Sequence, residues 1–69
     1  MLEKNQVVTL RERLAVKALK GRSHIVLGEK GDSFRVIKPH ETLAGYYYMR
    51  GSNDNCPPMS VIHFTEVVA

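Results

Sequence analysis

The sequence predicts an α+β fold in which one N-terminal helix packs on a small antiparallel sheet of about four strands, arranged as two hairpins. Three observations carry this prediction. A run of strong helix formers lies between a capping pattern and a glycine in residues 9–21. Two β-branched runs flank a glycine-bearing turn in residues 24–38, and an aromatic run and a valine-rich run flank a polar loop in residues 46–68.

The helix is predicted from its start, its interior and its end. Thr9 followed by Glu12 matches a capping box, in which Thr9 is the N-cap and the Glu12 side chain bonds back to the N-cap amide. The segment Leu10–Lys20 has apolar residues at helical spacing, and Gly21 stands where a helix-terminating glycine is expected. We therefore expect Leu14 to face the sheet from this helix.

The first predicted hairpin joins His24–Leu27 to Ser33–Lys38 through a turn that contains two glycines. In the second of these strands Phe34 and Val36 share one face, because side chains alternate along a strand. Pro39 ends the strand, since it has no amide hydrogen to donate to a neighbouring strand.

The second predicted hairpin joins a strand over Tyr46–Arg50 to a last strand over Val61–Val68 through the loop at residues 51–58. Both faces of the last strand are apolar, so we expect the helix to cover one face and a partner to cover the other. A homodimer is one such arrangement. A further short strand over residues 6–8, ahead of the helix, is optional.

Size and composition predict a single domain over residues 1–69. A chain this short buries only about 60% of its unfolded surface, so dividing it would leave two cores too small to be stable. The net charge of +3 and the pI of about 9.3 permit contact with nucleic acid without requiring it. One unpaired cysteine, Cys56, and the lack of a signal-like or membrane-spanning segment indicate a cytoplasmic protein with no membrane contact.

The pattern of metal ligands and glycines predicts neither a metal nor a cofactor. The soft and borderline metal ligands match no metal-binding spacing; they are His24, His40, His63 and Cys56. The glycines around Lys30 lack the spacing of a phosphate-binding loop. No catalytic residues are expected, so the chain is predicted not to be an enzyme.

Two surfaces are candidate partner-binding sites. Strand alternation places three residues of the aromatic run on one face and Tyr47 and Met49 on the other. We expect Tyr47 and Met49 to fill the core; the alternative is the inverted arrangement, in which Tyr47 is exposed. The second surface is the basic face of the predicted helix. The candidate residues are Tyr46, Tyr48 and Arg50 on the strand, and Arg13, Lys17 and Lys20 on the helix.

The leading functional hypothesis is a small cytoplasmic, non-enzymatic binding protein that acts through protein–protein contact, as an accessory, inhibitory or regulatory factor of the kind that compact bacterial or phage genomes encode. One alternative is a basic nucleic-acid-binding module, in which the helix cations and Arg22 contact phosphates while Tyr46 or Tyr48 stacks on bases. A third is a small nuclease-like enzyme with His24 or His63 as its general base. A steep fall of affinity with salt would separate the second hypothesis from the first.

Overall fold

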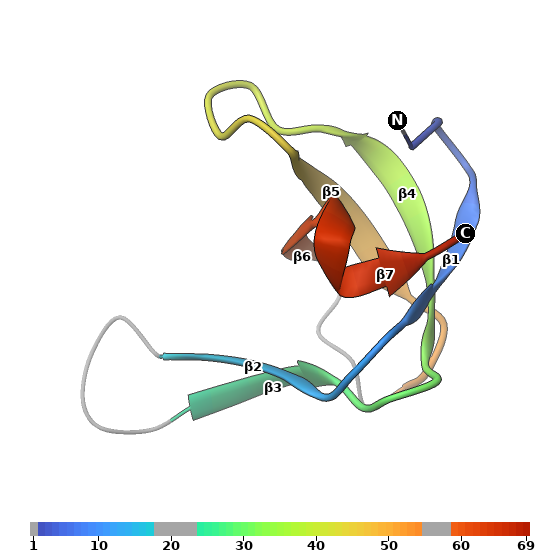
Figure 1. The fold of residues 1–69 in the computed structure, drawn as a ribbon, viewed down its shortest axis with the longest axis vertical. Coiled ribbons are helices and arrows are strands. Elements are labelled where there is room, and N and C mark those ends of the chain that lie inside the picture. The colour runs from blue at the N-terminus through green and yellow to red at the C-terminus, as the bar shows by residue number, and fades with distance from the viewer. Residues whose placement is uncertain (1, 18–23, 55–58) are drawn as a thin grey trace.

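A computed structural model describes residues 2–17, 24–54 and 59–69, and these residues form two antiparallel sheets (Figure 1). The larger sheet has five strands in the order β6-β5-β4-β1-β7, and the smaller pairs β2 with β3. The smaller sheet projects from the larger as a two-stranded ribbon, which we call the arm. The elements are β1 (Val7–Leu10), β2 (Leu14–Lys17), β3 (His24–Gly28), β4 (Ser33–Pro39), β5 (Tyr46–Gly51), β6 (Ser60–His63), the 3-10 turn η1 (Phe64–Glu66) and β7 (Val67–Val68).

The predicted helix over Leu10–Lys20 is wrong, and so is the α+β class: the described ranges contain no α-helix, and the fold is all-β. Thr9, predicted as the N-cap, is paired with β4 on one side and β7 on the other. Leu14–Lys17 forms β2, whereas the end of the predicted helix lies outside the described residues. Pairing on both sides of β1 buries Val8 and Leu10 to 1% exposure, and this burial outweighs helix propensity at the predicted helix start, Thr9 and Leu10. Leu14–Lys17 stays largely exposed and is held as a strand by its pairing with β3.

The strands of the first predicted hairpin exist, but their predicted pairing is wrong. β3 pairs with β2, and β4 pairs with β1 and β5. The turn between β3 and β4 is closed by Asp32, whose carboxylate accepts a hydrogen bond from the Glu29 amide at 2.8 Å. Backbone bonds between Leu10 and this turn, at 2.9 and 3.0 Å, hold it against β1. β4 therefore leaves the turn beside β1 rather than beside β3.

The second predicted hairpin is confirmed in part. β5 and β6 pair antiparallel, with Tyr46 opposite His63 and Tyr48 opposite Val61. The strand predicted over Val61–Val68 is interrupted by η1, after which β7 pairs with β1. The optional strand near residues 6–8 is present as β1. Because η1 joins the two edge strands, the five-stranded sheet curls around a core (Figure 1).

The core lies inside this curl and follows the alternation of the strands. Phe34 and Met49 are fully buried, and Val36 and Tyr47 are buried with them. The expected core position of Tyr47 and Met49 and the shared face of Phe34 and Val36 are confirmed. The remaining core residues are Val8, Leu10, Leu27, Ile62 and Val67. Leu14 packs against this cluster from the root of the arm and is only half-buried.

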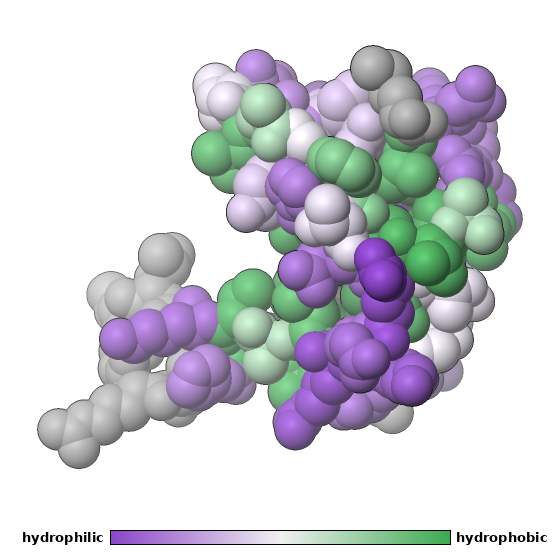
Figure 2. All heavy atoms as spheres, in the orientation of Figure 1, coloured by the Kyte–Doolittle hydropathy of each residue, from purple (hydrophilic) through white to green (hydrophobic). Residues whose placement is uncertain are grey.

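The arm exposes apolar side chains. Val16 and Ile25 are cross-strand partners and are 39% and 47% exposed. Figure 2 shows hydrophobic residues where the arm meets the body of the protein and hydrophilic residues farther out. In the described part of the chain, no helix has the length and apolar character needed to cross a membrane.

Candidate functional site

The outer face of β4, β5 and β6 carries the strand residues that the sequence singles out. Burial alternates along β5, so Tyr46, Tyr48 and Arg50 lie on the outer face while Tyr47 and Met49 point into the core. This face assignment is confirmed. The three outer residues nevertheless have different surroundings, and they do not form one continuous cluster.

Tyr46 belongs to an aromatic patch, which we define as Tyr46, His63 and Phe64. The Tyr46 and His63 rings meet edge to face with centroids 4.8 Å apart, and the His63 and Phe64 rings lie 4.7 Å apart. Tyr46 is 37% exposed and Phe64 is 48% exposed. The patch therefore presents aromatic surface to solvent at the junction of β5, β6 and η1.

Backbone and capping contacts hold the aromatic patch in place. His63 is the N-cap of η1, and its Nδ1 accepts a hydrogen bond from the Thr65 amide at 3.3 Å and lies 2.7 Å from Thr65 Oγ1. The Phe64 amide donates to the Gly45 carbonyl at 2.9 Å. Gly45 has a φ of 82°, and its lack of a side chain lets the His63 ring lie directly against it.

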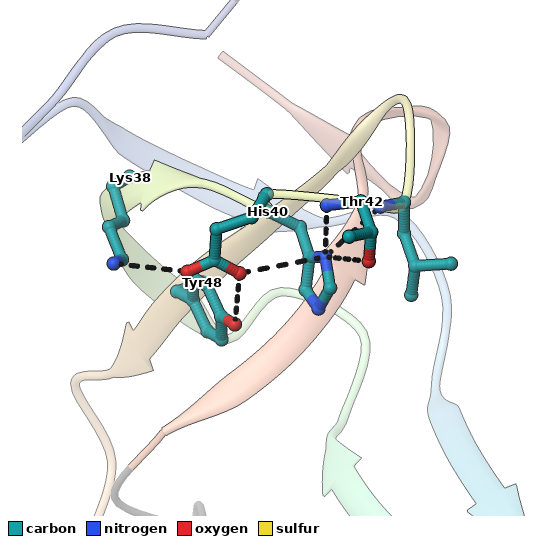
Figure 3. A network of polar contacts seen from close by, with 6 residues as sticks. Lys38, His40, Thr42 and Tyr48 are labelled. Carbon is teal, nitrogen blue, oxygen red and sulfur yellow. Dashed lines mark hydrogen bonds and ion pairs between the residues drawn. The ribbon is translucent and has the colours of Figure 1, made fainter.

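Tyr48 belongs to a polar network at the end of β4 (Figure 3). Its hydroxyl donates to Glu41 Oε2 at 2.9 Å, and Lys38 Nζ lies 3.2 Å from Glu41 Oε1. Lys38 Nζ is also 5.4 Å from the centroid of the Tyr48 ring. One carboxylate therefore joins two side chains that are cross-strand partners on β4 and β5.

His40 closes the loop from which Glu41 projects. Its Nδ1 accepts hydrogen bonds from the amides of Thr42 and Leu43, both at 3.1 Å, and its ring stacks on Tyr48 at 5.1 Å (Figure 3). A nitrogen that accepts these bonds carries no proton. The 3.9 Å approach of Nδ1 to Glu41 Oε2 is therefore not a charged pair.

These contacts shift the pKa values of both acidic groups in the network. Hydrogen bonds from its own backbone, from Tyr48 and from Lys38, in that order, lower the pKa of Glu41 from 4.5 to about 2. The hydrogen bond to Glu41 raises the pKa of Tyr48 above its usual 10.0. The Glu41 carboxylate is accordingly charged, and the Tyr48 phenol neutral, at pH 7.

We expect Glu41→Gln to lower the melting temperature slightly near neutral pH. The native pKa of Glu41 lies below that of the unfolded chain, so its contribution is complete above about pH 4.5 and is lost as the pH falls toward 2. The difference in melting temperature between wild type and variant should therefore shrink across that window. The carboxylate is 57% exposed, so screening keeps the effect small. A difference that stays constant from pH 7 to about 2 would contradict the assigned contacts.

The helix expected to align Arg13, Lys17 and Lys20 is absent from the described residues, which include Arg13 and Lys17. Arg13 Nε pairs with Glu29 Oε2 at 3.4 Å, and Lys17 lies on β2 opposite His24. Lys20, together with Arg22, lies outside the described residues.

The residues that sequence reasoning missed are Phe64, which was assigned to a strand, and Glu41, for which no local pattern gives a signal.

The three histidines lie in separate surroundings in the described part of the chain. No group of three His, Cys, Asp or Glu side chains that could hold a metal occurs in residues 2–17, 24–54 and 59–69. Nδ1 of His40 and Nδ1 of His63 are both occupied by loop and turn contacts, and His24 is exposed on the arm. Cys56 lies outside the described residues.

The search for related proteins found no matching family model, curated protein or solved structure.

Proposed function

We propose that this is a small, non-enzymatic binding protein that contacts another protein through the aromatic patch of Tyr46, His63 and Phe64. The observation that carries the proposal is the exposure of two large aromatic side chains, Tyr46 and Phe64, whose rings both contact the ring of His63. Tyrosine is among the residue types that most often dominate binding energy at protein interfaces, and aromatic residues in general are enriched there.

The use of aromatic residues in this chain supports the proposal. The sequence has three tyrosines, two phenylalanines and no tryptophan. Phe34 and Tyr47 are in the core, whereas Tyr46 and Phe64 remain exposed. A domain of 69 residues has little apolar surface to bury, so leaving aromatic rings in water forgoes stability that burial would provide. A partner that covers the patch would recover that contribution.

The rigidity of the patch supports the same conclusion. Its residues come from β5, β6 and η1, and the pairing of Tyr46 with His63 sets the spacing between the strands. Binding a partner would therefore immobilise few side chains that are not already held, which reduces the entropic cost of association. The Leu43 carbonyl accepts a hydrogen bond from the Tyr46 amide at 3.2 Å, and the Leu43 side chain is 48% exposed, so the loop before the patch carries a further exposed apolar residue.

The test is capture of the partner by immobilised protein from a lysate of the native host, with nuclease added to a parallel sample. We expect the Tyr46→Ala/Phe64→Ala variant to retain less than about one tenth of the protein captured by wild type, since interface hot spots each contribute about 2 kcal/mol or more. Nuclease treatment should leave the captured protein unchanged.

A matched control removes the same kind of exposed apolar surface elsewhere. Val7 and Val68 are 53% and 48% exposed, and a Val7→Ala/Val68→Ala variant should capture the partner as wild type does. Equal capture by the aromatic variant and by wild type would rule out the patch as the contact. Loss of the captured protein on nuclease treatment alone would assign the contact to nucleic acid instead.

Two further properties remain part of the proposal. We place the protein in the cytoplasm, on the composition of the sequence. The homodimer predicted from the last strand stays a prediction, and its surface is better sought on the arm, where the Val16–Ile25 pair is exposed. An isolated two-stranded ribbon is only marginally stable in water, so contact with another chain would stabilise it.

A further inference from the structure

Two arginines lie in register on the outer face of the sheet. Arg35 of β4 and Arg50 of β5 are direct cross-strand partners. Arg35 stands between the buried residues Phe34 and Val36, and Arg50 follows the buried Met49, so both arginine side chains are on the solvent side. Residues directly opposite each other in an antiparallel pair have their Cβ atoms about 5 Å apart. Both guanidinium groups can therefore reach the same small ligand.

No carboxylate in the described part of the chain neutralises this pair. The ion pairs found there are Arg13 with Glu29 and Lys38 with Glu41, together with the contact of His40 to Glu41. Neither Arg35 nor Arg50 takes part in them. Like charges directly opposite each other on neighbouring strands destabilise a sheet. An anion between the two arginines would remove this repulsion.

We propose that Arg35 and Arg50 form a binding site for a backbone phosphate of a single-stranded nucleic acid. A guanidinium is planar and always charged, and its parallel N–H groups match two oxygens of a phosphate. Two such groups in register can hold one phosphodiester from both sides. The site depends on these two arginines, and it stands independently of the protein contact proposed above.

The surroundings favour a nucleic acid as the source of the phosphate. The chain has ten Lys and Arg residues against seven Asp and Glu, so its field attracts polyanions. Tyr46 lies on the same strand and the same face as Arg50, four positions away, which is about 13 Å at the rise of a β-strand. Its exposed ring can stack on a base.

The same surroundings favour a single strand over a duplex. Bases that are already stacked and paired in a duplex are not free to stack on a protein side chain.

Tyr48, which lies between Arg50 and Tyr46 along β5, is in contact with His40 and with Lys38. Base stacking is therefore assigned to Tyr46, and phosphate binding to the arginine pair.

The experiment measures binding of a fluorescent single-stranded oligonucleotide of about twelve nucleotides, within the range of about 4–16 that small sheet modules cover. Anisotropy is followed at about 50 and about 200 mM salt for wild type and for Arg35→Gln/Arg50→Gln. We expect the variant to bind at least about tenfold more weakly at low salt, as expected for lost hydrogen bonds to a charged group. The slope of log affinity against log salt should become shallower by about 0.7, which corresponds to one phosphate.

A charge-matched control distinguishes a specific phosphate site from the general electrostatic attraction between a basic protein and the oligonucleotide. Lys4 and Lys30 are exposed, and a Lys4→Gln/Lys30→Gln variant loses the same charge while it keeps both arginines. The control should retain most of the wild-type affinity, and the arginine variant should melt no lower than wild type. The proposal is overturned if wild type does not bind at the lower salt, if the control loses as much affinity as the arginine variant, or if a duplex or a phosphorylated peptide binds as well as the single strand.

Discussion

Phe34→Ala is expected to destabilise the protein by about 3–5 kcal/mol, the usual cost of deleting a buried phenylalanine ring. Phe34 has 0% exposure, lies in the central strand β4, and is surrounded by core residues from the neighbouring strands. Small domains have about 0.05–0.15 kcal/mol of stability per residue, which is about 3–10 kcal/mol for 69 residues. Urea unfolding should therefore show a variant that is largely or wholly unfolded at room temperature.

Phe64→Ala is the matched control, because it removes the same ring from a position that is 48% exposed. It should shift the unfolding midpoint by much less than Phe34→Ala does. The same measurement on the Tyr46→Ala/Phe64→Ala variant checks that the protein used to test partner capture is folded. Equal destabilisation by the two substitutions would show that the Phe64 ring is packed in the folded protein in solution, and would remove it from the exposed aromatic patch.

Gly45→Ala is expected to destabilise the protein through two separate effects. Gly45 has a φ of 82°, a conformation that costs an alanine about 1–2 kcal/mol. A Cβ at this position would also lie 2.6 Å from His63 Nε2. The ring cannot yield freely, because His63 caps η1 and packs between Tyr46 and Phe64. Overpacking of this kind adds about 1–3 kcal/mol, and displacement of the ring should weaken partner capture as well.

Gly31→Ala separates the cost of the backbone conformation from the cost of the clash with the His63 ring. Gly31 has a similar φ of 91°, but no atom lies within 4 Å of the position that its Cβ would occupy. Urea unfolding of this variant should therefore show only the conformational cost of about 1–2 kcal/mol, with partner capture unchanged. If the two glycine variants unfold at the same denaturant concentration, the His63 ring moves aside at no cost and does not anchor the patch.

The two proposed sites overlap at Tyr46, although the arginine pair belongs only to the nucleic-acid site and Phe64 only to the protein contact. A protein partner on the aromatic patch and a single strand held at Arg35 and Arg50 would both cover that ring, so we expect them to compete. The nuclease-treated capture and the oligonucleotide titration measure the two ligands separately. The substitutions used in each are different, so failure of one proposal leaves the other open to its own test.

The local pattern of the sequence determined which residues share a face in β4 and β5. Alternation pairs Phe34 with Val36 and Tyr47 with Met49, because the period of a strand is set by the backbone alone, and burial in the folded protein makes both of these faces the inner ones. The same rule put Tyr46, Tyr48 and Arg50 on the outer face. The pairing of β5 with β6 was also predictable, since a polar loop with two prolines separates two strongly strand-forming runs.

Only the tertiary structure decided between helix and strand for residues 10–17 and chose the neighbours of each strand. Leu10–Lys17 has good helix formers and a capping pattern, yet its first residue belongs to β1, which gains two neighbouring strands and buries Val8 and Leu10, and Leu14–Lys17 pairs with β3. Those neighbours, β4 and β7, lie far along the chain, so no local window contains their contribution. No local window predicts η1 either, where the chain turns after His63 so that β7 pairs with β1. The Glu41 network likewise depends on Tyr48, which lies on β5. The physical reason in each case is that the free energy of strand pairing and of side-chain contact belongs to residues that only folding brings together.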